Sequence, residues 1–142
     1  MNPKRYSYLA VLVLLFLAAG CASSSKQILA TEQSQVALRS MQSRAFDTTD
    51  QKLMMRSVIN TLQDLDFLIQ DSSLDLGTVT GQKFSGITVV KISVTVKARN
   101  VKQLLVRANA QYGLKAIEDP KIYQDFFAAL EKSIFLTAQQ VD

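Results

Sequence analysis

The sequence predicts an α+β domain of two layers, in which two helices pack on one face of an antiparallel sheet. Two neighbouring segments, 87–99 and 102–112, alternate apolar and polar residues, and apolar residues recur at helical spacing before and after them. Each long strand is thus apolar on one face and each helix along one stripe, so the helices bury their stripes on the apolar face of the sheet. The expected order is α-β-β-β-β-α, with four strands, or five if residues 39–46 add an edge strand.

The first helix is expected over residues 49–65. Met54, Val58 and Leu62 recur at helical spacing, with polar residues on the other side. Thr48 is the predicted N-cap, with Gln51 as its capping-box partner three residues later.

Four strands are expected at residues 66–71, 78–84, 87–99 and 102–112, with turns at Gly77 and at Ser85-Gly86. In the two long strands one face is apolar (Val90, Ile92, Val94, Val96 and Ala98, then Leu104, Val106, Ala108, Ala110 and Tyr112). This pattern is typical of a sheet with one buried and one wet face, and it predicts a long antiparallel hairpin.

The last helix is expected to begin at Pro120, with Asp119 as its N-cap. Its predicted apolar stripe is Ile122, Phe126, Leu130 and Ile134, widened by Tyr123, Phe127 and Phe135. These aromatic residues exceed what one stripe can bury, so one or two of them are expected to be exposed for a partner.

The N-terminus has the pattern of a secretory signal peptide. Lys4 and Arg5 precede an apolar run from Tyr8 to Ala19, which is too short for a spanning helix and ends in small residues. The chain's only cysteine, Cys21, follows directly. A plain secretory signal with a chance cysteine is the alternative interpretation.

Residues 17–21, "LAAGC", resemble a bacterial lipobox. The resemblance implies cleavage between Gly20 and Cys21, attachment of a diacylglyceryl group to the thiol, and acylation of the new amino group. Three acyl chains would anchor the protein permanently. Because Ala22, and not Asp, follows the cysteine, the resemblance also implies sorting to the outer membrane of a Gram-negative cell, with the domain facing the periplasm.

The predicted domain organisation has three parts. Residues 1–20 are the signal peptide, 21–47 are the lipid anchor and a flexible linker, and 48–142 are the periplasmic α+β domain. The linker is small and polar over residues 22–37. A short helix over 31–38 is the alternative there.

Composition argues against several classes of function. The net charge is +4, and it falls to +2 (14 basic against 12 acidic residues) without residues 1–20, which does not favour nucleic acid. The chain has no histidine, one cysteine and no Gly-x-Ser-x-Gly motif, so we expect no enzyme, no cofactor and no zinc site. Asp64, Asp66, Asp71 and Asp75 lack the spacing of an EF-hand loop, so we expect no metal site.

The wet face of the predicted hairpin is the candidate binding face. It carries four basic residues interleaved with hydroxyl and amide side chains, namely Lys91, Lys97, Arg99 and Arg107. Such a face suits an acidic protein, peptidoglycan or anionic lipid headgroups. An ordinary solvated face is the alternative.

Residues 39–81 and the segment "IYQDFFAALEKSIFL" (122–136) resemble small, uncharacterised proteobacterial outer-membrane lipoproteins. The topology also resembles a helix-grip arrangement and the repeated domains of BamC, a lipoprotein of the outer-membrane barrel-assembly machine. The resemblance implies a location and a fold, and no catalytic residue. We therefore expect a non-enzymatic lipoprotein that docks onto an envelope complex for transport, secretion or assembly. A tethered carrier of a lipid or small apolar ligand is the alternative, and a contact with peptidoglycan or lipopolysaccharide is a third.

Overall fold

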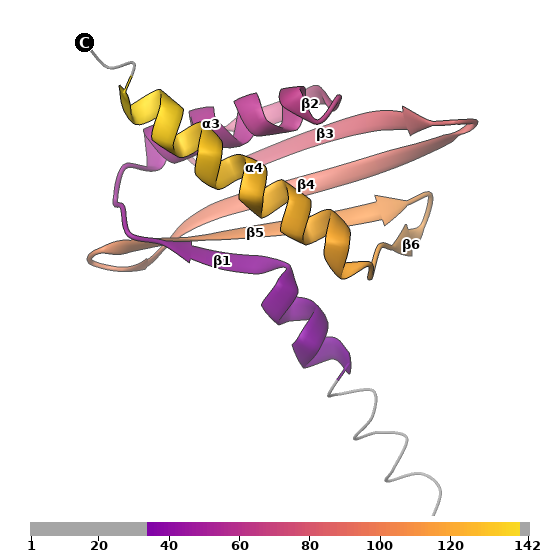
Figure 1. Ribbon diagram of the computed structural model, residues 1–142, viewed down its shortest axis with the longest axis horizontal. Helices are drawn as coiled ribbons and strands as arrows, with labels where there is room; N and C mark the ends of the chain where they lie inside the picture. The colour runs from indigo at the N-terminus through magenta and orange to yellow at the C-terminus, as the bar shows by residue number, and fades with distance from the viewer. Residues whose placement is uncertain (1–33, 140–142) are drawn as a thin grey trace, which may run out of the picture. The chain divides into compact units, whose positions relative to one another are not determined.

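The computed structural model describes residues 34–139 (Figure 1). The predicted signal peptide, Cys21 and residues 22–33 of the predicted linker lie outside this range. Residues 34–41 are helical, which overlaps the helical alternative for the linker. From Leu38 onward the chain forms one compact unit.

That unit is an α+β domain, as predicted, with six strands in place of the expected four or five. Its helices are α3 (Gln51–Asp64) and α4 (Pro120–Gln139). Its strands are β1 (Ser43–Phe46), β2 (Leu68–Ser73), β3 (Thr78–Ser85), β4 (Thr88–Asn100), β5 (Gln103–Tyr112) and β6 (Lys115–Ala116). The sheet is antiparallel in the order β1-β5-β4-β3-β2, and the short β6 also pairs with β5.

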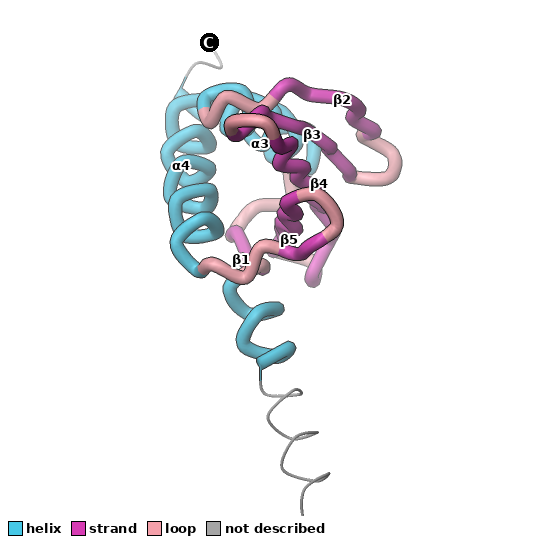
Figure 2. The backbone as a smooth tube through the Cα atoms, turned by 90° about the vertical axis from the view of Figure 1, so that its right-hand side faces the viewer, coloured by secondary structure: helices cyan, strands magenta, loops and turns pink. Residues whose placement is uncertain are grey.

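The two long helices and the sheet form two layers (Figure 2). Alternate residues of β4 and β5 point to the helices, so Val94, Val96 and Val106 are fully or almost fully buried. On the helix side, Met54, Val58 and Leu62 of α3 meet these strands as predicted. The core therefore lies between the helices and one face of the sheet, and the other face is left to solvent.

The N-cap of α3 differs from the prediction. Asp50 caps the helix, since its Oδ1 accepts a hydrogen bond from the backbone N–H of Leu53 at 2.8 Å. The predicted cap, Thr48, instead accepts from the backbone N–H of Asp50 at 3.2 Å and so supports the turn before the helix. The side chain of Gln51 also does not cap the helix, because it donates to the carbonyl of Leu74 at 3.1 Å.

The buried stripe of α4 agrees with the prediction at Phe126 and Leu130 and differs at its first residue. The start of the helix agrees, because Asp119 Oδ1 accepts from the N–H of Lys121 at 2.9 Å and Pro120 is the first helical residue. However, Tyr123 is buried, whereas Ile122 is 39% exposed. The cause is the Tyr123 hydroxyl, which reaches the sheet and finds hydrogen-bond partners there. The expected exposed aromatic side chain is Phe135, at 62%.

The segment expected to add an edge strand at residues 39–46 does so over its second half. Residues 39–41 are helical, and β1 follows, pairing from Ser43 to Phe46 with Arg107 to Leu104 of β5. Gln42 lies between helix and strand, and its carbonyl accepts from the N–H of Ala108 at 2.9 Å. Residues 42–46 are thus an integral part of the sheet.

Candidate functional site

The solvent-facing side of the sheet carries polar side chains in ordered rows. The register pairs Thr80 with Ser93 and Ser93 with Asn109, which places these three side chains in one row. A second row joins Gln82, Lys91 and Gln111. The rows form because polar residues occupy every second position of three adjacent strands, and alternate side chains point to the same face.

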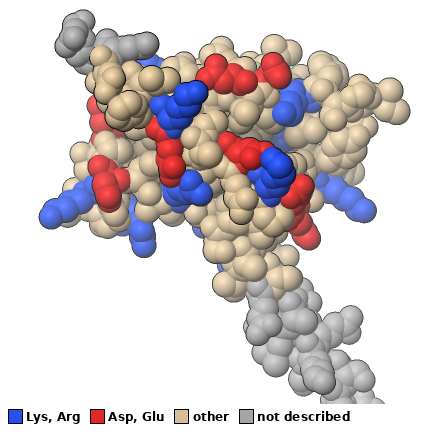
Figure 3. Space-filling view, in the orientation of Figure 1, with Lys and Arg blue, Asp and Glu red and all other residues tan. Residues whose placement is uncertain are grey.

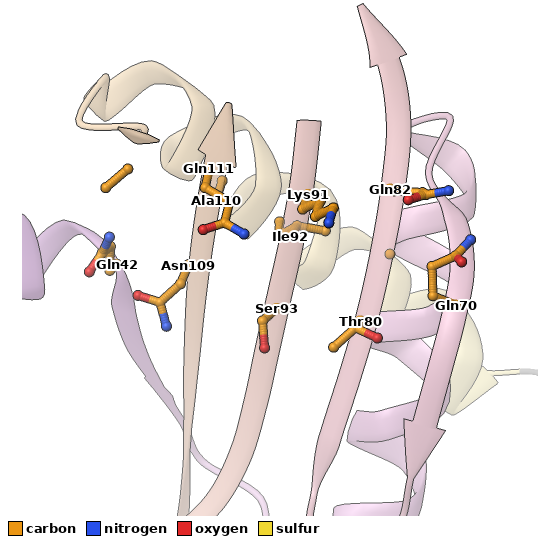
Figure 4. A pocket seen from close by; sticks show the side chains of 12 residues that line it. Gln42, Gln70, Thr80, Gln82, Lys91, Ile92, Ser93, Asn109, Ala110 and Gln111 are labelled. Atoms are coloured by element: carbon orange, nitrogen blue, oxygen red, sulfur yellow. The ribbon is translucent and has the colours of Figure 1, made fainter. Parts of the chain in front are cut away.

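These two rows line a hollow of about 500 Å³, which we call the amide groove (Figure 4). It is lined by Gln42, Gln70, Thr80, Gly81, Gln82, Lys91, Ile92, Ser93, Asn109, Ala110, Gln111 and Ala116. Five of these residues carry side-chain amides, and Lys91 is the single charged residue among them. The amide of Gln42 is buried and donates to the Tyr123 hydroxyl, whereas the other four offer both donors and an acceptor. The groove therefore fits a ligand with many uncharged donors and acceptors, such as a polypeptide backbone.

The four predicted basic residues do not form one cluster. Lys91 lies in the groove, whereas Lys97 is six residues along the same strand, about 20 Å away. Arg107 pairs with Thr95, which places it diagonally across from Lys97, and its Nε donates to Ser43 Oγ at 3.1 Å. Lys97 and Arg107 are thus diagonal neighbours on this face, and Lys91 lies apart from them. Arg99 is the residue at an irregularity in the β4–β5 pairing, two positions after Lys97.

Sequence reasoning missed the contribution of β2 and β3 to this face. Thr80 and Gln82 share it with β4 because the register pairs them with Ser93 and Lys91. The alternation in "TVTGQKF" could have placed both residues on one face. Gln70 was harder to place, because a β-bulge between Ile69 and Asp71 shifts the register of β2.

The acidic residues near the end of α3 and along β2 do not gather into one site. Asp66 adopts φ 65° just after α3, and its N–H donates to the carbonyl of Gln63 at 3.0 Å, which ends the helix. Asp71 lies on the edge strand β2. Within residues 34–139, no three histidine, cysteine or acidic side chains gather as a group able to hold a metal ion.

The space between the helices and the sheet is filled by side chains. Tyr123, Phe126, Phe127 and Leu130 of α4 are each no more than 2% exposed, and the rings of Phe126 and Phe127 meet edge to face with centroids 5.1 Å apart. A ligand held there would have to displace these residues. The groove on the opposite face, in contrast, is open to solvent.

Comparisons with known proteins give no family. No protein-family model matches the chain, and no curated protein matches it. Among solved structures, the chain is similar to the adenylate sensor from AMP-activated protein kinase in complex with ZMP, with a TM-score of 0.47 and 13% sequence identity. That match covers 65% of this chain and 94% of the other, and it is too distant to bear on function. In the described part of the chain, no helix has the length and apolar character needed to cross a membrane.

Proposed function

We propose that this protein is a non-enzymatic lipoprotein of a bacterial cell envelope that docks onto an envelope protein through the open face of its sheet. The amide groove is the observation that supports this proposal. The groove is preformed on a rigid sheet, and its 500 Å³ lies in the range of small binding sites.

The chemistry of the groove favours a polypeptide partner. An extended peptide presents a repeating series of N–H and C=O groups, and unpaired ones are costly when an interface covers them. The amides of Gln82, Asn109 and Gln111 can pair with either group, whereas fixed charges would pair with only one. Lys97 and Arg107 lie beyond the groove along the hairpin, and they would favour an acidic side chain on the partner.

The proposed location is the outer membrane, with lipidated Cys21 as the anchor and the domain in the periplasm. Support for this comes from the lipobox pattern alone. Twelve residues separate Cys21 from residue 34, and 12 residues span at most about 40 Å. A lipid on Cys21 would therefore hold the domain close to the bilayer and to membrane-bound partners, which raises their effective concentration.

The filled core favours docking over the carrier alternative. A carrier of a lipid or apolar ligand needs an apolar cavity, and the place expected for it is occupied by Tyr123, Phe126 and Phe127. The open groove is polar, so it suits an apolar ligand poorly.

Site-specific photo-crosslinking in intact cells tests the proposal. A photoreactive amino acid replaces Ser93 or Asn109 in the groove, and Lys132 on the exposed side of α4 in a matched control. We expect one defined envelope protein, identified by mass spectrometry, from both groove positions and not from Lys132, and loss of that adduct in Cys21→Ser. Adducts that are the same at all three positions, or absent from the groove, would overturn docking. Co-purified lipid in that case would favour the carrier.

A further inference from the structure

Four exposed apolar residues gather at one end of the sheet, and we call them the tip surface: Phe84, Ile87, Tyr112 and Leu114. Ser85 pairs with Thr88 across the β3–β4 turn, and Tyr112 pairs with Lys115 across the β5–β6 turn. The backbone N–H of Gly113 also donates to the carbonyl of Val89 at 3.4 Å. Both turns therefore lie at the same end of the sheet, where β3 meets β4 and β5 meets β6 (Figure 1).

Both turns project into solvent. Ile87 and Leu114 are fully exposed, and each follows a glycine with positive φ, 61° at Gly86 and 60° at Gly113. A Cβ atom built on either glycine would meet no atom within 4 Å. The two aliphatic side chains are thus the outermost points of two convex turns, and no part of residues 34–139 covers them.

The residues behind these points form two further layers. Phe84 (68% exposed) and Tyr112 (45% exposed) lie one step back, and the strand register places them on opposite faces of the sheet. Exposed Lys115 lies level with Tyr112, with which it pairs, and exposed Lys91 lies one step further back. Aliphatic side chains outermost, with aromatic rings and basic groups behind them, is the order that suits the depth profile of a lipid interface.

Charges near the tip surface permit such a contact. Lys83 turns back, donating to the carbonyl of Leu65 at 3.3 Å, and Lys121 pairs with Asp125 at 2.6 Å. Glu118 and Asp119 lie after β6, ahead of α4, and carry the remaining negative charge in this region. The β3–β4 turn itself is free of charged residues, as its uncharged surface in Figure 3 shows.

The opposite end of the sheet lacks this layering. Val101 is 90% exposed in the β4–β5 turn, and Lys102 follows it directly, as Lys115 follows Leu114, but no exposed aromatic side chain of the sheet lies behind it. In the β2–β3 turn, Asp75 separates two exposed leucines. A charge within an apolar tip opposes its transfer into lipid. Val101 therefore serves as a control position of matched exposure.

We infer that the tip surface inserts into the interface of a lipid bilayer. Isolated convex points give little contact area to a rigid protein surface, which needs a contiguous packed patch, whereas a fluid interface adapts to them. This inference rests on the anchored location proposed above, because the tether holds the tip surface near a bilayer. Docking would then take place with the amide groove beside the membrane.

Tryptophan fluorescence tests the inference, since the chain has no tryptophan of its own. The full-length variants Ile87→Trp, Leu114→Trp and Val101→Trp are expressed in bacterial cells and purified with whatever N-terminal processing those cells carry out. They are then mixed with vesicles of phosphatidylethanolamine and phosphatidylglycerol that contain brominated acyl chains. We expect a blue shift and strong quenching for Ile87→Trp and Leu114→Trp, and unchanged emission for Val101→Trp. Because all three positions are exposed, the fold is expected to persist, which far-UV circular dichroism checks.

Other results overturn the inference. If vesicles left the emission of Ile87→Trp and Leu114→Trp unchanged, the tip surface would remain in water. If Val101→Trp were quenched as strongly as the two tip variants, the domain would contact lipid without a preferred orientation. A blue shift that depends on protein concentration and needs no lipid would show self-association. Mass spectrometry of Cys21 reports separately whether the anchor is present, and the groove crosslinks report separately on docking.

Discussion

The side-chain amide of Gln42 donates a hydrogen bond of 3.1 Å to the hydroxyl of Tyr123, 81 residues later in the chain. The same hydroxyl accepts from the N–H of Ala110 at 3.3 Å and donates to the carbonyl of Ile117 at 2.6 Å. One phenol thus joins the start of the sheet, the outer edge of β5 and the loop before α4. On β5, the hydroxyl bonds a residue that lies between the segment paired with β1 and the segment paired with β6.

Tyr123→Phe is expected to lower the free energy of unfolding by about 1–3 kcal/mol, because it leaves the buried groups of Gln42 and Ala110 without their acceptor. Chemical denaturation followed by circular dichroism measures the change. Tyr112→Phe, at an exposed position, is the control and should stay within about 0.5 kcal/mol of the wild type. Equal effects of the two substitutions would show that the Tyr123 hydroxyl does not hold this junction together.

The position of the α3 cap gives a second prediction. Asp50→Ala should cost about 1 kcal/mol of stability, since it removes the acceptor for the N–H of Leu53. Thr48→Ala should cost less, because its bond to the N–H of Asp50 lies outside the helix. Denaturation midpoints of the two variants decide between the caps, and a larger loss at Thr48 would restore the assignment made from sequence.

Two buried hydroxyls on α3 give a prediction of increased stability, in contrast to the losses of stability predicted above. Ser57 and Thr61 are fully buried, and their hydroxyl oxygens have no hydrogen-bond partner within the described residues. Thr61→Val removes such a group with little change of shape, so it should stabilise the domain by about 1 kcal/mol. Thermal and chemical denaturation measure this, and a clear loss of stability would show that the hydroxyl is satisfied in solution.

Alanine substitutions at Gly77 and Gly113 distinguish the cost of backbone strain from the cost of a steric collision. Both have positive φ, but a Cβ at Gly77 would lie 2.2 Å from the carbonyl oxygen of Val96, whereas one at Gly113 would meet nothing within 4 Å. Gly113→Ala should cost only about 1–2 kcal/mol, the penalty of the left-handed conformation. Gly77→Ala must also displace β4 backbone, so its loss of stability should be clearly larger in the same denaturation assay. Equal losses of stability would mean that the turn at Gly77 shifts enough to relieve the collision with Val96.

The fold was predictable from periodicity because its elements are strongly amphipathic. In β4, Val90, Ile92 and Val94 are buried as the alternation indicates, and this pattern decides which face the helices cover. That Tyr123 and not Ile122 is the buried residue at the start of α4 was not predictable in this way. Ile122 and Tyr123 are adjacent and both apolar enough for the stripe, and the choice depends on partners for the Tyr123 hydroxyl that come from distant parts of the chain.

The candidate site was predictable only in part, for the same reason. Alternation placed Lys91, Lys97 and Arg107 on the wet face, but spacing along a strand does not say which residues of other strands lie beside them. The groove depends on pairing between β2, β3, β4 and β5, and on the bulge in β2 that re-aims its residues near Gln70. Long-range register of this kind is set by the whole fold.

The last prediction concerns the two basic residues that the sheet brings together. Lys97→Glu with Arg107→Glu reverses the charge on one side of the open face and leaves the lining of the amide groove intact. If an acidic partner docks there, the yield of the Asn109 photo-crosslink should fall on the order of tenfold, which corresponds to about 1.4 kcal/mol. Lys132→Glu on α4 is the matched control and should leave the yield unchanged. The wild-type yield in the double variant would mean that the partner contacts the groove without these charges, and that the basic residues only keep this face solvated.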